Sequence, residues 1–388
     1  MSYRTVSAVA LLLATPAAAL ATGSATGGLV ALSDLNLIVL GNMTGGHDVE
    51  GKTFVGGSIS GGTSTYGIGR TNQGEAVSGY ATLTVGGNLN GGNISNGSNG
   101  GNGTIAARKS VDIGGSFTGG GNFTVDGAIV RAGSSLSGFN INGGTDVSYG
   151  IGATGFQNTQ PVKDASLAPA GANDLHASIA AQTATLTADL TTLSTALYAL
   201  SAAGSSFDGS DHNNAKLIAR DPNNLGYAVI TIDSTNLTSF LDASNLIYDI
   251  PSVAGGGYLT TIINVTGASS YTLNANSNNS AYNPYVLWNF GMATSITLGK
   301  QFNGALLAPF ATVSNSTPIE GSVAVGTFNQ GGEVHLGTFR PDTQLITALT
   351  PKIFVGGVPE PLTWTQMIVG FGLIGLLGRR RSTKVVAA

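Results

Sequence analysis

The sequence has no cysteine and few charged residues, and both features restrict what the protein can be. Without cysteine the chain forms no disulfide, no thiolate zinc site, no iron–sulfur cluster and no cysteine nucleophile. Only 9% of its 388 residues are charged, against about 25% in an ordinary globular protein. Four histidines leave little material for a histidine-rich metal site. We therefore expect no cofactor.

Glycine is abundant, with 58 residues, whereas proline contributes only 12. No Gly-X-Y period is present, so the chain is not collagen-like. A hydrophobic content of 42% argues against wholesale disorder. A polar but uncharged chain that still has apolar residues to bury is more typical of an extracellular β-architecture with tight turns than of a cytosolic enzyme.

The first 21 residues have the pattern of a secretory signal peptide. Arg4 supplies the positive start and residues 9–13 lie in a short apolar stretch. Ala19 and Ala21 form an A-x-A-like cleavage site. The alternative interpretation is a buried N-terminal helix.

The C-terminus predicts a membrane span. Residues 362–377 are apolar and follow a Pro-Glu-Pro tripeptide made of Pro359, Glu360 and Pro361. Sixteen helical residues would span about 24 Å, slightly less than a hydrocarbon core of about 30 Å. The cluster of Arg379, Arg380 and Arg381 follows at once. The positive-inside rule would hold this cluster in the cytoplasm and the main body outside the inner membrane. A permanent single-span anchor is the alternative.

The tripeptide, Trp364 three residues later, a glycine-containing span and the arginine cluster together resemble the PEP-CTERM sorting signal, over residues 358–381. The resemblance implies an exosortase that cleaves at or near the tripeptide, and a transient rather than permanent membrane helix. It further implies a Gram-negative bacterium with exopolysaccharide-linked surface export. Thr365 stands where the family often has alanine. Residues 346–357 would be a linker.

Removal of both ends would take away five basic residues and one acidic residue, which leaves a net charge of about −8. An acidic chain argues against nucleic acid as a partner. The expected partners are therefore signal peptidase and exosortase during export, with exopolysaccharide or another surface ligand afterwards.

The body repeats one short pattern. Residues 53–62, 83–92 and 111–120 share the template apolar-Gly-Gly-polar-apolar-polar-Gly-Gly, in which Val55, Val85 and Ile113 are 30 and 28 residues apart. Repeated short strands with glycine turns predict stacked coils. We expect a mainly β protein built as an irregular β-solenoid, similar to a right-handed β-helix. Residues 63–80 and 93–104 are expected to be loops.

A leucine stripe interrupts this pattern and predicts a helix at about 173–200. Its apolar residues are Leu175, Ile179, Leu186, Leu190, Leu193, Leu197 and Leu200. Asn173 or Asp174 is a suitable N-cap, and Gly204 lies beyond the end. We expect the helix to pack alongside the solenoid, with heptad pairing to another molecule as the alternative. Strands are expected again at 227–232, 246–250, 259–265, 285–290 and 295–298.

Two further resemblances concern the body. Residues 35–42 and 48–51, together with Ala308-Pro309, 321–323 and 332–335, resemble the choice-of-anchor A domain over about 30–345. That domain occurs on bacterial surface proteins. The closing segment is also similar to the end of bacterial ice-binding β-solenoids, in which one long helix packs beside the strands. This second resemblance bears on the fold more than on the activity.

Few residues suggest chemistry. His47, Asp48 and Glu50 lie together after Gly45-Gly46 and could contribute to a metal site, but a polar turn that anchors the first coil is the simpler interpretation. Glu333 and His335 alternate on one strand face and could pair as carboxylate and base. A structural hydrogen bond at the last coil is the preferred interpretation.

Three other groups remain as candidates. The densest group of charged residues in the repeats comprises Arg108, Lys109, Asp112, Asp126 and Arg131. It could be a catalytic site similar to that of polysaccharide lyases, or a solvated face. Thr82 and Thr84 form one T-x-T step of an ice-binding face, without a visible ladder of such steps. Tyr66, Tyr80 and Tyr149 could stack on sugar rings, or could equally be ordinary surface residues.

These features favour a secreted, exosortase-sorted protein of the cell surface or extracellular matrix, with a structural or adhesive role. We expect no enzymatic activity and predict no catalytic, cofactor-binding or metal-binding residue. The alternatives are a carbohydrate-active enzyme similar to a lyase, and an ice- or carbohydrate-binding adhesin.

Overall fold

The protein is described by a computed structural model covering residues 22–351, except 62–63, 68–79, 92, 95–109, 120–123, 127–128, 139, 143–145, 157–159, 202 and 278. The chain divides into two compact units, Met1–Leu349 and Thr350–Ala388. The described residues lie almost entirely in the first unit. The predicted signal peptide and sorting signal lie outside the described residues.

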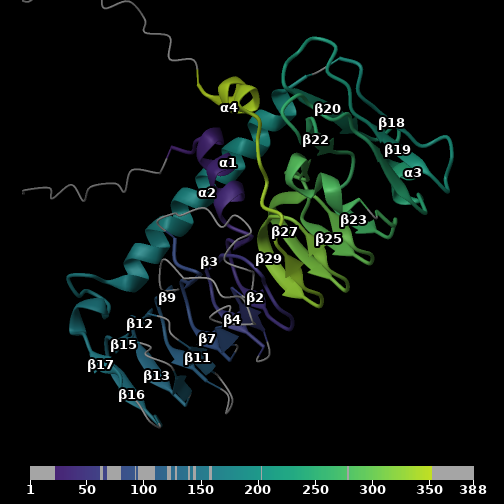
Figure 1. The fold of residues 1–388 in the computed structure, drawn as a ribbon. Helices are drawn as coiled ribbons and strands as arrows, with labels where there is room; N and C mark the ends of the chain where they lie inside the picture. The colour runs from purple at the N-terminus through teal and green to yellow at the C-terminus, as the bar shows by residue number, and fades with distance from the viewer. Residues whose placement is uncertain are drawn as a thin grey trace, which may run out of the picture. The chain divides into compact units, whose positions relative to one another are not determined.

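The N-terminal half of the domain consists of coils with three strand positions (Figure 1). The first face contains β1 (Leu37–Val39), β3 (Thr53–Val55), β6 (Leu83–Val85), β9 (Ser110–Ile113), β12 (Ile129–Ala132), β15 (Asp146–Tyr149) and β17 (Val162–Lys163). The second face contains β2 (Met43–Thr44), β4 (Ile59–Ser60), β7 (Leu89–Asn90), β10 (Phe117–Thr118), β13 (Ser135–Ser137) and β16 (Gly152–Thr154). The third contains β5 (Thr65–Tyr66), β8 (Asn93–Ile94), β11 (Thr124–Asp126) and β14 (Asn140–Asn142).

The C-terminal half repeats this arrangement with longer strands. Its first face contains β20 (Tyr227–Ile232), β22 (Thr260–Val265), β24 (Val286–Asn289), β27 (Ala305–Asn315) and β29 (Val323–Gln330). Strands β27 and β29 continue onto the second face beside β23 (Ser270–Leu273) and β25 (Ser295–Leu298). The third face has β26 (Phe302–Asn303), β28 (Ile319–Glu320) and β30 (Val334–His335). A separate sheet joins β18 (Ser206–Asp208), β19 (Ala215–Ile218) and β21 (Leu246–Asp249).

Almost every strand pairs in parallel, and the spacing of the sequence repeat sets the register. Val55 lies opposite Val85, and Val85 lies opposite Ile113, as the shared template requires. The inward residues of successive coils form one continuous apolar core, which a single coil could not bury. The predicted mainly β, solenoid-like fold is therefore confirmed.

The two halves meet at a seam between β1 and β29. Leu37 pairs with Thr53 on one side and with Val323 on the other. The chain therefore starts in the middle of the stack, builds coils outward to β17, and then crosses to the other end. From there the second half builds back toward β1, so the last long strand completes the stack beside the first.

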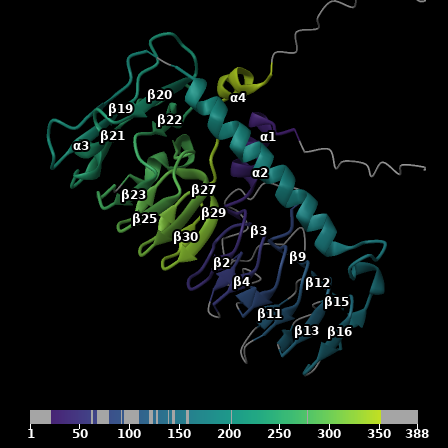
Figure 2. The same ribbon diagram turned by 180° about the vertical axis from the view of Figure 1, so that it is seen from behind.

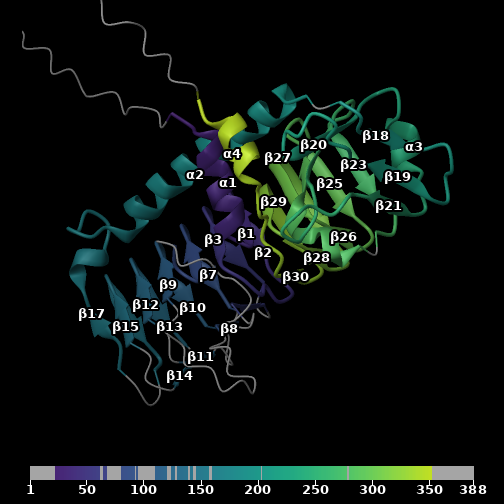
Figure 3. The same cartoon turned by 45° about the horizontal axis from the view of Figure 1, so that its top comes forward.

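Helix α2 (Leu175–Ala199) makes this crossing, and it contacts β9, β22 and β27 (Figure 2). The predicted helix at 173–200 is confirmed, with Asp174 as its N-cap accepting a hydrogen bond from the Ala177 amide at 2.9 Å. Every residue of the predicted stripe except half-buried Leu200 is buried. Helices α1 (Ala25–Asp34) and α4 (Thr343–Leu349) lie beside α2 over the first face (Figure 3).

Glycines allow α2 to approach one corner of the coils. A Cβ on Gly86 would overlap the carbonyl oxygen of Gly56, and a Cβ on Gly114 would overlap that of Gly86. A Cβ on Gly56 would also overlap Thr183 of α2. The Gly-Gly pairs of the template are therefore required by close stacking and by the helix that lies against them.

Several sequence predictions need correction. The loops expected at 63–80 and 93–104 contain β5 and β8, which supply the third face. Both strands have only two residues, too short for any periodic pattern to identify. Helix α4 extends to Leu349, so the predicted linker begins with helical residues. Short elements α3 (Leu237–Leu241), η1 (Ala165–Leu167) and η2 (Ser280–Tyr285) complete the description. Within the described residues, none of the helices combines the length and the hydropathy that a membrane span needs.

Candidate functional site

The second face carries two rows of exposed or half-exposed polar side chains that cross both halves of the solenoid. The inward residues of its strands, such as Ile59, Leu89 and Phe117, are fully buried. Because side chains alternate along a strand, their neighbours point outward. The outer row consists of Thr272, Thr297, Ser314, Asn329, Thr44, Ser60, Asn90, Thr118, Ser137 and Thr154, in stacking order.

The second row lies two residues earlier along the strands. In the C-terminal half it comprises Ser270, Ser295, Thr312 and Thr327, which are paired in register. In the N-terminal half it continues through Asn42, Ser58, Asn88, Ser116 and Ser135. Parallel strands place neighbouring rungs about 4.8 Å apart and the two rows about 6.6 Å apart. The result is a regular grid of hydroxyl and amide groups.

Hydrogen bonds between coils order this grid in its N-terminal half. The Ser58 amide donates to Asn42 Oδ1 at 2.9 Å, and the Asn88 amide donates to Ser58 Oγ at 3.0 Å. The Ser116 amide donates to Asn88 Oδ1 at 2.8 Å. Each of these side chains therefore caps the backbone of the next coil, which fixes its orientation before any ligand binds. No residue of either row is charged.

The T-x-T step that sequence reasoning chose lies elsewhere. Thr84 is on the first face and is 3% exposed, and Thr82 is 7% exposed. Neither is available to a surface ligand. The true ladder was missed because adjacent rungs, such as Thr44 and Asn329, come from distant parts of the sequence. The recurring polar residue after each Gly-Gly pair was the signal that could have revealed the inner row.

Within the group of His47, Asp48 and Glu50, the two carboxylates have a structural role. Asp48 Oδ1 accepts from the Thr65 amide at 2.9 Å, and Glu50 Oε2 accepts from the Leu336 amide at 2.7 Å. The two carboxylates thus tie the first coil to its neighbours on opposite sides. Within the described residues, no group of three or more histidine, aspartate or glutamate side chains is arranged to hold a metal ion.

His335 lies between two glutamates on the third face. Its Nδ1 is 2.7 Å from Glu320 Oε1 and its Nε2 is 2.7 Å from Glu333 Oε2. Burial lowers the pKa of His335, but the hydrogen bonds to Glu333 and Glu320 raise it by more, so the net shift is upward. The predicted Glu333–His335 pairing is present, as part of a clamp at the last coils.

The charge group proposed for lyase-like chemistry is divided by the fold. Arg131 binds Asp112 through two hydrogen bonds, with Nε to Oδ1 at 2.7 Å and Nη2 to Oδ2 at 2.6 Å. Asp126 belongs to β11 of the third-face sheet, whereas Asp112 belongs to β9 of the first face. Arg108 and Lys109 lie outside the described residues.

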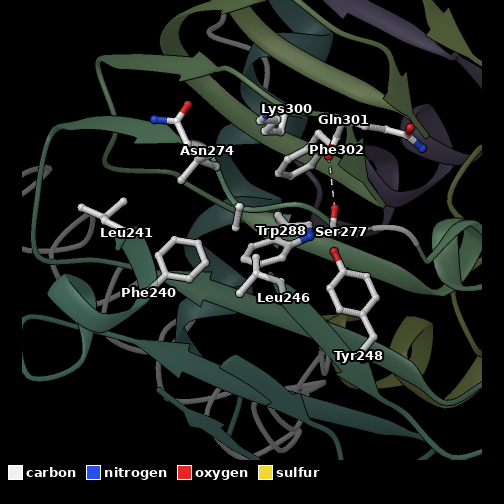
Figure 4. Close-up of a pocket in the computed structure, with 12 residues that line it drawn as sticks. Phe240, Leu241, Leu246, Tyr248, Asn274, Ser277, Trp288, Lys300, Gln301 and Phe302 are labelled. Carbon is white, nitrogen blue, oxygen red and sulfur yellow. Dashed lines mark hydrogen bonds between the residues drawn. The ribbon is translucent and has the colours of Figure 1, made fainter. Parts of the chain in front are cut away.

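The three tyrosines do not form a sugar-stacking surface. Tyr66 is fully buried in the core. Tyr80 is half-buried and meets Phe54 edge-on, with ring centroids 5.9 Å apart. Tyr149 is half-buried and packs against the core cluster. A separate cavity of about 20 Å³ lies inside the C-terminal half beside Tyr248, Trp288 and Phe302 (Figure 4), and is far too small for a sugar ring.

The remaining predicted site residues lie outside the described residues. They are the signal-cleavage residues Ala19 and Ala21, and the sorting residues Pro359, Glu360, Pro361, Trp364, Arg379, Arg380 and Arg381. Their roles stay predictions.

Two solved structures are similar to this chain. One is an ice-binding protein from an Antarctic bacterium, Flavobacteriaceae, with 14% identity, 81% of this chain and 98% of that chain covered, and a TM-score of 0.24. The other is an ice-binding protein from the Antarctic ascomycete Antarctomyces psychrotrophicus, with 18% identity, coverage of 60% and 94%, and a TM-score of 0.20. A search of curated proteins finds no match.

One family model matches most of the chain. It covers residues 28–336, from α1 to the end of the third face, and is described as "Putative Ice-binding-like adhesive domain". The matched segment contains both rows of the second face and the helix that crosses the stack. The chain belongs to this family of ice-binding-like adhesive domains.

Proposed function

We propose that this protein is an extracellular adhesin whose second face binds an ordered, uncharged polysaccharide. The observation that carries the proposal is the pair of polar rows, of which the outer spans ten described strands and the inner nine, without a charged side chain. Membership of the adhesive-domain family supports the same general role.

The chemistry of the grid suits a surface covered in hydroxyl groups. Serine, threonine and asparagine side chains each donate and accept hydrogen bonds, as sugar hydroxyls do. A single such contact contributes little in water. Many contacts on one rigid face act together, and little conformational entropy is lost because the backbone is fixed by the stack. We propose a binding rather than a catalytic role.

Export and sorting form part of the proposal. The signal peptide predicted at 1–21 would direct the chain through the inner membrane. The PEP-CTERM signal predicted at 358–381 would retain it until an exosortase cleaves near Pro359–Pro361. Release at the cell surface would bring the second face to exopolysaccharide. The choice-of-anchor A resemblance, which also concerns surface proteins, agrees with this destination.

Ice is a second candidate ligand for the same face. The regular spacing of the two rows favours it, because a flat grid of hydroxyl groups can order water as a crystal surface does. An ice ligand and a polysaccharide ligand would use the same side chains.

Binding of the mature domain to insoluble solids tests the proposal. The probes are cellulose, insoluble mannan, calcium alginate and growing ice crystals. We expect retention on a neutral polysaccharide, and a large loss when Thr44 and Thr118 are both changed to lysine. Thr185→Lys, on the exposed side of α2, is the matched control and should bind normally. Binding to ice alone would select the second candidate. Equal binding by the double variant and the control would refute the role of the face.

A further inference from the structure

An open groove of about 750 Å³ lies between the first face and the start of α2. Its size falls within the range of about 300 to 1,000 Å³ that is usual for small-ligand sites. It is separate from the second face, because it is lined by residues of β9, β12, the η1 segment and α2.

The groove exists because the outward side chains of the first face change from apolar to charged along the stack. Near the seam this row is apolar, with Ile38 followed in register by Phe54, and both are buried under the helices. Further along, the same row continues as Thr84, Asp112 and Arg131. A helix with a leucine stripe cannot cover a charged row without leaving the charges unsolvated.

In this region α2 instead packs against the glycines at the turn between the first and second faces, such as Gly86 and Gly114. A Cβ built on Gly86 would lie 3.4 Å from Ile179, and one built on Gly114 would lie 3.0 Å from the His176 backbone. The helix start is therefore displaced toward the corner, and the floor of the groove remains open above Asp112 and Arg131.

The floor is a fixed pair of polar groups. Both oxygens of Asp112 are held by Arg131, whose side chain remains 46% exposed while that of Asp112 is 16% exposed. The guanidinium has five N–H donors and uses two on Asp112, so Arg131, which lines the groove, keeps donors for a ligand. The carboxylate oxygens keep free lone pairs. Donor and acceptor groups held side by side in this way match the neighbouring hydroxyls of a sugar ring.

The walls add polar side chains and carboxylates. Leu167, Leu175 and Ile179 lie buried behind the wall, so the surface open to a ligand comes from the exposed Ala172, Asn173 and Ser178. Asp164 and Asp174 line the rim, and local hydrogen bonds lower the pKa of each, led by Ser166 for Asp164 and by the Ala177 amide for Asp174. Three carboxylates against one guanidinium disfavour an anionic ligand.

We propose that this groove is a second binding site, which takes a short, uncharged oligosaccharide on the Asp112–Arg131 pair. A domain with one site for an extended surface and another for a soluble chain would cross-link the two. The proposal does not depend on what the second face binds.

The test uses titration calorimetry of the mature domain with neutral pentasaccharides of glucose, mannose, galactose and N-acetylglucosamine. Oligogalacturonate serves as the anionic probe. We expect at least one neutral probe to bind with a millimolar or lower dissociation constant, and oligogalacturonate to bind at least tenfold more weakly. No binding by any neutral probe, or preference for the anionic one, would overturn the proposal.

Variants locate the site. Ser178→Trp places a large ring into the groove and should abolish binding, whereas Ala180→Trp, on the same helix but turned away, should not. Arg131→Ala should weaken binding at least tenfold while circular dichroism stays unchanged. The double variant Thr44→Lys and Thr118→Lys should bind the pentasaccharide normally, which separates this site from the second face. Binding that survives Ser178→Trp would place the sugar elsewhere and refute the assignment.

Discussion

Leu37 and Val323 lie opposite one another on neighbouring parallel strands, although they come from the two ends of the solenoid domain. Their pairing forms the seam where the two half-stacks meet. Buried Asn36 joins both sides of this seam. Its Nδ2 donates to the carbonyl oxygens of Gly321 at 3.1 Å and His335 at 2.9 Å, and its Oδ1 accepts from the Gly51 amide at 2.9 Å.

Asn36→Ala should therefore be strongly destabilising. It leaves two carbonyl groups and one amide without their partner, and each unsatisfied buried group costs about 1 to 3 kcal/mol. We expect a loss of about 3 kcal/mol or more in the free energy of unfolding, measured by urea denaturation. Asn90→Ala, on an exposed rung, is the control and should change stability by less than about 0.5 kcal/mol. Equal effects would show that Asn36 does not hold the seam.

Gly86→Ala should destabilise the domain by forcing two neighbouring coils apart. The new methyl group would overlap the Gly56 carbonyl oxygen, which is backbone and cannot rotate away. Overpacking of this kind costs about 1 to 3 kcal/mol, and we expect a clear drop in melting temperature by calorimetry. Gly152→Ala is the matched control, since its Cβ would lie 3.7 Å from Ser135 Oγ, an ordinary contact. A melting temperature for Gly86→Ala no lower than that of Gly152→Ala would contradict this account.

Leu190→Ala tests the contribution of α2 packing. Leu190 is fully buried in the cluster between the helices and the first face. Its truncation should cost about 2 to 5 kcal/mol. Thr185→Ala, on the exposed side, should be neutral or slightly stabilising because alanine is the better helix former. The free energies of unfolding of the two variants, measured by chemical denaturation, should therefore differ. A Leu190→Ala variant as stable as the wild type would show that the leucine stripe is not needed for stability.

The His335 clamp should make stability depend on pH. The folded-state pKa of His335 is raised above its ordinary value of 6.5, so protonated His335 stabilises the fold. This contribution is fully present below the unfolded-state pKa and is lost as pH rises through the raised folded-state pKa. Glu320, Glu333 and Glu50 are the charged groups around it.

We expect the melting temperature of the wild type to exceed that of His335→Gln most near pH 6, and the difference to shrink by about pH 9. Scanning calorimetry across this range measures it. A gap that widens as pH rises would show that neutral His335 is the stabilising form.

The sequence predicted the strands with a strong local pattern. The expected ranges 227–232 and 295–298 coincide with β20 and β25, and the Gly-Gly template gave the register of β3, β6 and β9. The helix at 173–200 was also correct within two residues at each end. In these segments the apolar period and the turn residues are both local properties.

What the sequence could not predict depends on pairing between distant segments. Nothing local indicates that β1 stacks on β29, and therefore nothing aligns Thr44 with Asn329. Helix α1 was missed because its stretch of alanine and glycine has no clear apolar stripe. The Asp112–Arg131 pair was noticed as charge density, but its geometry follows from β9–β12 register. The sequence therefore indicated the charged pair of the groove without its geometry, and it did not indicate the rows of the second face.

The position of the seam has a consequence for how the chain is made. Synthesis proceeds from the N-terminus, yet the edge of β1 is closed only by β29, almost 300 residues later in the chain. Until then the nascent half-stack presents an unpaired strand edge, which invites association with other chains. Contacts of such long sequence separation also form slowly. The domain is therefore completed only after its whole length has been synthesised. A product truncated before β29 would keep the edge of β1 unpaired, and this edge would favour aggregation with other copies of the chain.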